Sequence, residues 1–277
     1  MEKYITKEDG KEEAFKEEKI RKSLLNSGTD PDVVNSATSK IKSRLNEIIK
    51  SEDIYRLVLD HLKKKQPGAA IKYTLKKAIM KLGPAGYIFE KYFAKILEAH
   101  GFKTKVSCIM KGFCVDHEVD VVAEKNNKHI MVECKYHNDL GTKSDIKTVL
   151  YVHSRFADIK KACVKDINSH NFSEVWLATN TKCTSEAIKY AECMKMGVVA
   201  WHYPQKKNLE DYIESKKLYP VSILPGLKEY NKNKLFDSNI LTIQDFLENT
   251  PDLIAKALSI NKSKTNKLFA EAALLMT

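Results

Sequence analysis

Glu118 and Asp120 stand in one short acidic stretch of the sequence, and Glu133 and Lys135 stand in a second. The residues around both stretches are typical of β-strands, in which alternate side chains face the same side of a sheet. Each pair therefore shares a face of its strand. The polar segment 124–128 between them is typical of a turn, which predicts that the strands pair as an antiparallel hairpin. Such a hairpin would bring three carboxylates and one ammonium group together.

Carboxylates that share a partly buried site raise one another's pKa values unless a cation compensates their charge. Mg²⁺ binds oxygen ligands from one or two carboxylates and keeps its other positions for water and phosphate. It would acidify a water molecule there and neutralise charge on a displaced phosphate oxygen. Lys135, a compact point charge, would orient that water or stabilise the developing charge. These residue types therefore indicate a metal-dependent nuclease centre.

The alternative is a solvated hairpin whose acids and lysine form surface ion pairs, each worth about 1 kcal/mol or less. The flanking sequence favours the buried sheet, because the charges interrupt apolar strand residues, namely Val119, Val121, Val122, Ile130, Met131 and Val132.

Motifs on either side of the acidic stretches occur in a recognisable order. Gly86-Tyr87-Ile88-Phe89-Glu90 opens an amphipathic helix that Gly101-Phe102 ends, and Trp176-Leu177-Ala178-Thr179-Asn180 precedes another helix and a last strand. In this order, residues 83–204 resemble the Mrr-like branch of the PD-(D/E)XK restriction endonuclease superfamily. The resemblance implies a three-layer α/β/α core and cleavage of DNA.

The same resemblance implies a role for each site residue. Asp120 and Glu133 would hold Mg²⁺ or Mn²⁺, Lys135 would be the catalytic lysine, and Glu90 would reach the site from its helix. The family's proline before the acid is absent, so the acids two and four residues before Asp120 compete for its role. Asp120 is preferred because the earliest acid lies near the start of the strand. Glu118 is the second choice and a further candidate metal ligand.

Length and charge point to several modules and a polyanionic partner. The 277 residues exceed a common domain size of roughly 100–150 residues. The formal charge of +11 favours DNA, because neutralising phosphates releases counterions and supplies affinity that does not depend on sequence. A solvated basic surface is an equally good explanation of any single lysine cluster.

Composition also bears on location. No apolar run approaches the roughly 20 residues that cross a bilayer, so no membrane partner is expected. The N-terminal residues are charged, which predicts no secretory signal. Six cysteines show no CxxC pair, which predicts reduced thiols rather than a zinc site or a disulfide framework. A cytoplasmic protein is therefore expected.

The N-terminal eighty or so residues show a different pattern. Two short strands are predicted near residues 4–6 and 13–15, and amphipathic periodicity then predicts helices at 17–25, 32–49, from the possible cap 51–53 through 62, and 69–82. Three motifs stand among them: Ile5-Thr6-Lys7-Glu8-Asp9-Gly10, Phe15-Lys16-Glu17-Glu18-Lys19-Ile20 and Ser51-Glu52-Asp53-Ile54. With these motifs, residues 3–81 resemble an ATP-cone, a regulatory nucleotide-binding module.

The ATP-cone resemblance implies ATP or dATP as a regulatory ligand. Lys7 and Lys19 would contact its phosphates, Ser51 would donate a hydroxyl, and Lys72 stands where the family often has arginine. Glu8 replaces a usual arginine, a charge reversal that would weaken nucleotide binding or change its selectivity. Nucleotide binding would select one arrangement or oligomeric state, so a homo-oligomer is expected.

The C-terminal part of the sequence shows a third pattern, different from those of the two preceding segments. Ile223-Leu224-Pro225-Gly226-Leu227 and the later segment 259–264 are each followed by apolar residues at helical spacing, and this pattern resembles tandem helix-hairpin-helix domains. Such hairpins present backbone N–H groups to phosphate. The first has one glycine where the motif usually has two, and the second has none, so DNA contact and protein packing are equally open. Lys228, Lys262 and Lys264 are the residues to test first.

These observations predict an ATP-cone at 1–82, an Mrr-like nuclease domain at 83–205, and a linker with a small helical domain at 206–277. The expected function is a nucleotide-regulated, Mg²⁺-dependent DNA endonuclease, with defence against foreign or modified DNA as the role that the resemblance implies. A nucleotide-sensing DNA-binding regulator without cleavage activity is the alternative. An assembly protein that oligomerises through its ATP-cone is a third possibility.

Overall fold

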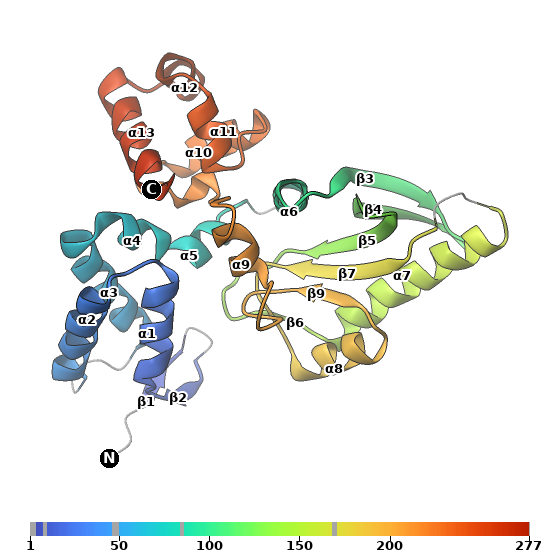
Figure 1. Cartoon of the computed structure of the whole chain (residues 1–277), viewed down its shortest axis with the longest axis horizontal. Coiled ribbons are helices and arrows are strands. Elements are labelled where there is room, and N and C mark those ends of the chain that lie inside the picture. Colours follow the sequence, from blue (N-terminus) through green and yellow to red (C-terminus); the bar gives the residue numbers. More distant parts are fainter. Residues whose placement is uncertain (1–3, 8–9, 46–49, 84–85, 168–170, 277) are drawn as a thin grey trace. The chain divides into compact units, whose positions relative to one another are not determined.

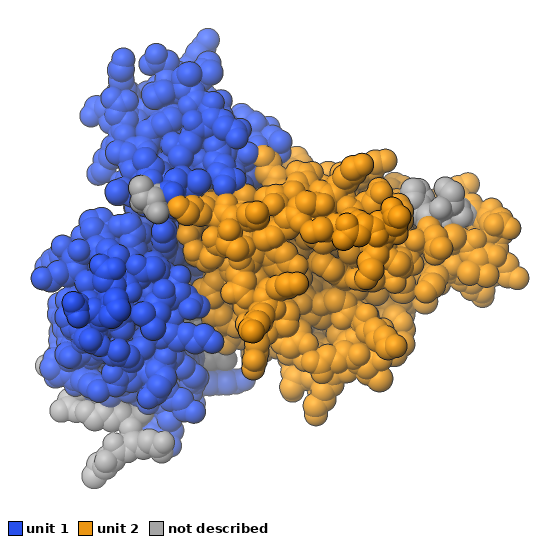
Figure 2. Space-filling view, viewed as in Figure 1, with its two compact units in different colours: residues 1–79, 221–277 blue, residues 80–220 orange. Residues whose placement is uncertain are grey.

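The computed structural model describes residues 4–7, 10–45, 50–83, 86–167 and 171–276. The chain forms two compact units, which Figure 2 colours separately. Unit 1 combines residues 1–79 with 221–277, and unit 2 contains residues 80–220.

A five-stranded sheet is the centre of unit 2. Its strands run in the order β3-β4-β5-β7-β9, antiparallel from β3 to β5 and parallel from β5 to β9. The bounds are β3 Lys103–Lys111, β4 Asp116–Lys125, β5 Lys128–Lys135, β7 Glu174–Thr179 and β9 Gly197–Val199. Parallel neighbours need crossover connections. The helices α7 (Ile146–Val164) and α8 (Ser185–Cys193) supply them.

Helices cover both faces of this sheet (Figure 1). On one face α6 (Tyr87–Ala99) packs against β3, β4 and β5. On the other, apolar residues of α7 and α8 form a core with Val119, Met131 and Leu177. The predicted three-layer α/β/α fold is therefore confirmed. Unit 2 ends with α9 (Leu209–Glu214), so residues 206–220, expected to begin the C-terminal part, lie in unit 2.

The long helix α7 has a well-defined start. Asp145 caps α7 by accepting the Thr148 N–H at 3.1 Å, so Ile146 is the first helical residue. Lys143 and Ser144 instead form a short strand, β6, which pairs with β8 (Lys182–Cys183). The helix ends at Val164, and residues 168–170 lie outside the described part.

The N-terminal part of unit 1 is a β-hairpin followed by helices, as predicted. Its elements are β1 Tyr4–Thr6, β2 Glu12–Ala14, α1 Glu17–Asn26, α2 Pro31–Arg44, α3 Ser51–Lys65, α4 Pro67–Lys72 and α5 Leu75–Ile79. The single helix predicted over 69–82 is wrong. It is divided after Lys72, where the Thr74 hydroxyl donates to the Ile71 carbonyl at 2.7 Å in place of a continuing helix.

The C-terminal segment of unit 1 consists of short helices: η1 Val221–Ile223, α10 Glu229–Asp237, α11 Ile243–Glu248, α12 Pro251–Leu258 and α13 Lys262–Met276. Thr242 and Asp245 form a capping box that starts α11. Within unit 1, α13 packs on α4, and the Ser222 hydroxyl donates to the Ala78 carbonyl at 2.7 Å. None of the helices in the described ranges is long and apolar enough to span a bilayer.

Candidate active site

The β4 ladder is interrupted at Asp120 on both sides. Towards β5 the pairing ends at Val121 and Val132, beyond which β5 continues to pair with β7 as far as Lys135. Towards β3 the paired residues skip Ser107, which has a positive φ of 50°. In the gap, the Asp120 carboxylate accepts the Cys134 N–H at 2.7 Å. Asp120 and Glu133 therefore lie where two strands part.

Glu90 of α6 joins these acids. Burial, together with the negative charges of Asp120 and Glu118, raises the pKa of its carboxyl to about 7. The charges of Asp120 and Glu118 therefore act on the Glu90 carboxyl. We call Glu90, Glu118, Asp120 and Glu133 the acidic fork.

Glu133 is held at an unusual pKa by the same causes. Burial and the Asp120 charge raise the pKa of Glu133 to about 7, against the lowering effect of Arg155. Burial also raises the pKa of Asp120, although the Cys134 N–H opposes the shift. Both carboxyls are ionised less readily than usual because like charges are gathered away from water.

Arg155 of α7 is a site residue that sequence reasoning missed. Its guanidinium is buried and pairs with Glu133 at 2.5 Å, while its other terminal nitrogen donates to the main-chain carbonyl of Glu118. The signal was present, because Arg155 interrupts the apolar face formed by Val152 and Ile159. A buried charge needs a partner, so an arginine in such a face indicates an acid opposite.

Lys135 ends β5 with an exposed side chain. Its charge lowers the pKa of Glu133, but its ammonium forms no hydrogen bond or ion pair with any residue that the structure describes. The backbone after it is fixed, because the Asn180 amide accepts the His137 N–H at 2.9 Å and donates to the His137 carbonyl at 2.8 Å. The His137 ring forms a hydrogen bond with the Ser144 hydroxyl at 2.9 Å.

His117 lies near the start of β4. It contacts Asp158 at 2.9 Å, and Asp158 also accepts the Cys114 N–H. This cluster anchors the β3–β4 turn to α7.

The fork suits a hard cation by its chemistry but is not a closed metal cage. Among the described residues, no group of three or more His, Cys, Asp or Glu side chains is gathered closely enough to hold a metal ion. The donors are carboxylate oxygens with raised pKa values, and Mg²⁺ needs only one or two of them. Asp120 and Glu133 therefore fit a divalent cation that keeps most of its water.

In the ATP-cone, Lys7 and Lys19 converge on one carboxylate. Glu13 of β2 lies 3.6 Å from the Lys7 ammonium and accepts a short hydrogen bond from Lys19. The hydrogen bond from Lys19 is the main cause that lowers the pKa of Glu13. We call Lys7 and Lys19 the lysine pair; it is gathered around an anion of its own chain.

The other predicted nucleotide contacts are less clearly grouped. An isolated bridge joins Thr6 to Lys50, which places Ser51 on a backbone next to that of Lys7. Ser51 is the first residue of α3 and does not cap it, because Lys50 occupies the cap position. Lys72 is the last residue of α4. Glu8 lies outside the described residues.

The C-terminal hairpins place their lysines at helix starts. Lys228 occupies the cap position of α10, and Lys262 begins α13. The Lys264 N–H donates to the Asn261 side chain at 2.9 Å. Ser259 takes the left-handed conformation, φ 55°, that glycine usually supplies in such a turn.

Family models match three consecutive segments of the chain. An ATP cone domain matches residues 3–81, a restriction endonuclease domain of the Mrr catalytic type matches 84–206, and an AF1548-like C-terminal domain matches 219–276. The predicted fusion of an ATP-cone with an Mrr-like domain is confirmed.

Two relatives are similar over nearly their whole length. An uncharacterized protein of Archaeoglobus fulgidus is 36% identical over 179 residues, which is 65% of this chain and 97% of the relative. The crystal structure of AF1548, described as a protein of unknown function, is 33% identical with a TM-score of 0.57. That match covers 68% of this chain and 97% of the AF1548 chain.

Proposed function

Because the chain belongs to the family of AF1548 and joins a restriction endonuclease domain to an ATP-cone, we propose that it is a nucleotide-regulated, Mg²⁺-dependent DNA endonuclease. The observation that carries the proposal is the acidic fork. Asp120 and Glu133 lie where β4 and β5 part, and Glu90 approaches from α6. A site that gathers buried acids gains stability when a divalent cation enters.

Each residue has a distinct task in phosphodiester hydrolysis. Asp120 and Glu133 would hold Mg²⁺ or Mn²⁺, which supplies an acidified water and neutralises phosphate charge. Arg155 holds Glu133 and the Glu118 carbonyl in place. Lys135, exposed at the end of β5, would orient the attacking water or stabilise charge on the phosphate. Glu118 is exposed and is a candidate for an outer ligand.

The ATP-cone would supply control. ATP or dATP would bind at the lysine pair and bias the chain toward one arrangement or homo-oligomer, which requires different affinities for the two states. Light scattering with and without each nucleotide tests this part. Unchanged mass and shape, together with unchanged nuclease activity, would contradict regulation.

A plasmid cleavage assay tests the enzyme. Wild-type protein is incubated with methylated or unmethylated plasmid in Mg²⁺, Mn²⁺ or EDTA, each with ATP, dATP or no nucleotide. We expect cleavage that needs the divalent ion and falls by at least about 100-fold in Asp120→Asn. Glu124→Gln, an acid on the same strand beyond the fork, should cleave like wild type. Equal cleavage by Asp120→Asn and wild type would overturn the proposal.

One observation favours a second function, a nucleotide-sensing DNA-binding regulator that does not cleave. Glu133 is already paired with Arg155, which gives this carboxylate a cation without a metal. Calorimetric titration with Mg²⁺ separates the two. Salt-dependent DNA binding without Mg²⁺ uptake at the fork would favour the regulator.

A further inference from the structure

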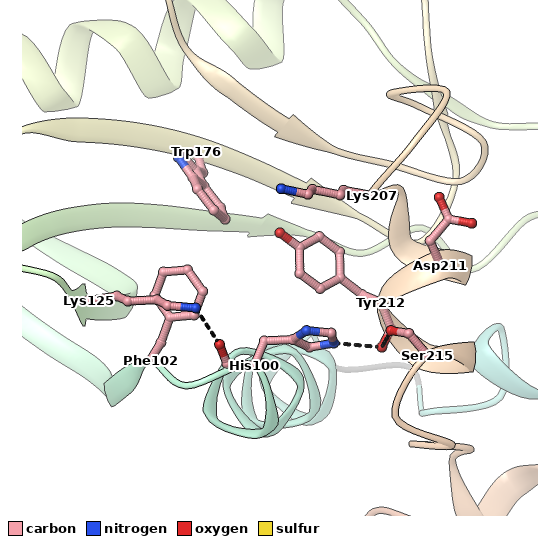
Figure 3. A pocket seen from close by; sticks show the side chains of 8 residues that line it. All are labelled: His100, Phe102, Lys125, Trp176, Lys207, Asp211, Tyr212 and Ser215. Carbon is pink, nitrogen blue, oxygen red and sulfur yellow. Dashed lines mark hydrogen bonds between the residues drawn. The ribbon is translucent and has the colours of Figure 1, made fainter.

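Unit 2 contains a cavity of about 460 Å³ that shares no residue with the acidic fork. It lies between the sheet and α9 (Figure 3), and its volume is within the usual range for small-ligand sites. Its lining is His100, Phe102, Lys125, Trp176, Lys207, Asp211, Tyr212 and Ser215.

Aromatic rings form one side of the cavity, and their positions are fixed. Phe102 and Trp176 meet edge to face with ring centroids 5.9 Å apart. The Trp176 indole N–H donates to Glu174 at 3.0 Å. A Cβ at Gly197 would lie 2.3 Å from the indole, so glycine at this position of β9 gives the ring its space. These contacts fix the positions of the two rings, so that the rings do not fill the cavity themselves.

Two donors are directed into the same space. Figure 3 shows the Lys207 ammonium and the Tyr212 hydroxyl directed toward the cavity beside Trp176. Neither group forms a hydrogen bond or ion pair with a residue in the described ranges. Lys207 has a positive φ of 63°, a left-handed backbone conformation that residues other than glycine rarely adopt.

The remaining charges are already engaged. The Lys125 ammonium donates to the His100 carbonyl at 2.6 Å and lies 4.9 Å from the centroid of the Phe102 ring. The Asp211 carboxylate accepts hydrogen bonds from the Asn208 main chain and side chain. Lys207 therefore supplies a positive charge that has no ion-pair partner within hydrogen-bond reach among the described residues, in a lining that also contains the Asp211 carboxylate.

We propose that this cavity binds an unpaired nucleotide, with its base against Phe102 and Trp176 and its phosphate at Lys207 and Tyr212. Aromatic rings accept any base by stacking, and a neighbouring cation accepts the phosphate. The nucleotide has two possible sources, a free mononucleotide or one residue of a single DNA strand. The site is separate from the fork, so the proposal stands whether or not the chain cleaves DNA.

Tryptophan fluorescence of the full chain provides the test, because the chain has two tryptophans and Trp201 is buried. We expect dAMP to change Trp176 fluorescence and to bind more tightly than deoxyadenosine or inorganic phosphate. Lys207→Ala should weaken dAMP binding by roughly tenfold or more, because it removes a charge-assisted hydrogen bond. Its exposed neighbour provides the matched control, and Lys206→Ala should bind like wild type.

A double variant separates this cavity from the ATP-cone. Lys7→Ala with Lys19→Ala should retain the dAMP response if the response arises in unit 2. Single-stranded oligo(dT) compared with dAMP identifies the source of the nucleotide, and binding of either supports the proposal. No fluorescence or calorimetric response to dAMP and oligo(dT) would overturn it. Equal losses in Lys207→Ala and Lys206→Ala, or loss of the response in the double variant, would do so as well.

Discussion

At the acidic fork, half-buried carboxylates raise one another's pKa values, whereas in the ATP-cone the lysine pair shares the carboxylate of Glu13. The first site gathers like charges and compensates them with one arginine, Arg155. At the lysine pair, the positive charges of Lys7 and Lys19 are already compensated by the carboxylate of Glu13. A cation would therefore stabilise the fork, whereas the lysine pair would have to release Glu13 before it could bind phosphate.

Magnitudes decide how strong that competition is. The side chains of Lys19 and Glu13 are 56% and 34% exposed, and such pairs are worth about 1 kcal/mol or less. A charge-assisted hydrogen bond to phosphate is worth roughly 1.5–3 kcal/mol. A triphosphate that bound at the lysine pair would therefore displace Glu13 at a modest loss of affinity.

The largest expected effect tests whether the fork is catalytic. Lys135→Ala should reduce Mg²⁺-dependent cleavage by about 10²–10³-fold, because it removes a positive charge aimed at the reacting phosphate. Lys105→Ala, an exposed lysine on β3, removes the same charge elsewhere on the sheet and should cleave like wild type. Plasmid nicking rates measure both. Equal rates in the two variants would place Lys135 outside the chemistry.

Arg155→Met tests the internal cation of the fork. Removing one partner of a buried ion pair leaves the other charge uncompensated, so the free energy of unfolding in EDTA should fall by about 3 kcal/mol. Mg²⁺ should restore part of the loss if it binds Glu133. Urea unfolding of Arg155→Met with and without Mg²⁺ measures this recovery. A loss that Mg²⁺ leaves unchanged would mean that the cation does not reach Glu133.

The acidic fork and the lysine pair also differ in how much of each could be predicted from the sequence. Strand alternation and the turn at 124–128 predicted the hairpin, because both depend on local pattern. The parting of the strands at Asp120 could not be predicted from local pattern, because β4 leaves β5 after Val132 while β7 continues to pair with the other edge of β5 as far as Lys135. Arg155 was missed because its partner Glu133 lies far away in sequence.

In the ATP-cone, the family motifs indicated Lys7 and Lys19 but not the acid between them. Glu13 lies in a strand whose register with β1 determines which lysines it meets. The helix predicted over 69–82 failed for a local reason, because the Thr74 hydroxyl competes for a backbone carbonyl. Family resemblance therefore identified residue types, and tertiary pairing determined their partners.

The pH dependence of stability separates a fork of like charges from an ordinary surface. The pKa of Glu90 is raised to about 7 from a usual 4.5, so the folded state binds this proton more tightly than the unfolded state. Stability from this group is present at low pH and is lost as the pH rises through about 4.5–7. Wild type should therefore lose stability relative to Glu90→Gln, whose amide cannot ionise, between pH 5 and pH 8.

Comparing the variants removes contributions that they share, such as the neutral His137, whose lowered pKa has the opposite effect. We expect a difference in Tm of roughly 2–4 °C in EDTA, after allowance for solvent screening of a partly exposed group. Mg²⁺ should reduce it, because a cation favours the ionised fork. A constant difference from pH 5 to pH 8 would show that neither burial nor the neighbouring charges raise the pKa of Glu90.

The smallest expected effect concerns Glu13. Glu13→Gln keeps the shape of the side chain but removes the negative charge that competes with phosphate, so ATP or dATP should bind roughly three- to tenfold more tightly. Glu12→Gln removes the same charge from the exposed neighbour on β2 and should change affinity by less than about twofold. Isothermal titration at two salt concentrations measures both affinities. If the variants gain equally, general repulsion explains the effect; if Glu13→Gln binds more weakly, Glu13 holds the lysine pair in place for the nucleotide instead of competing with it.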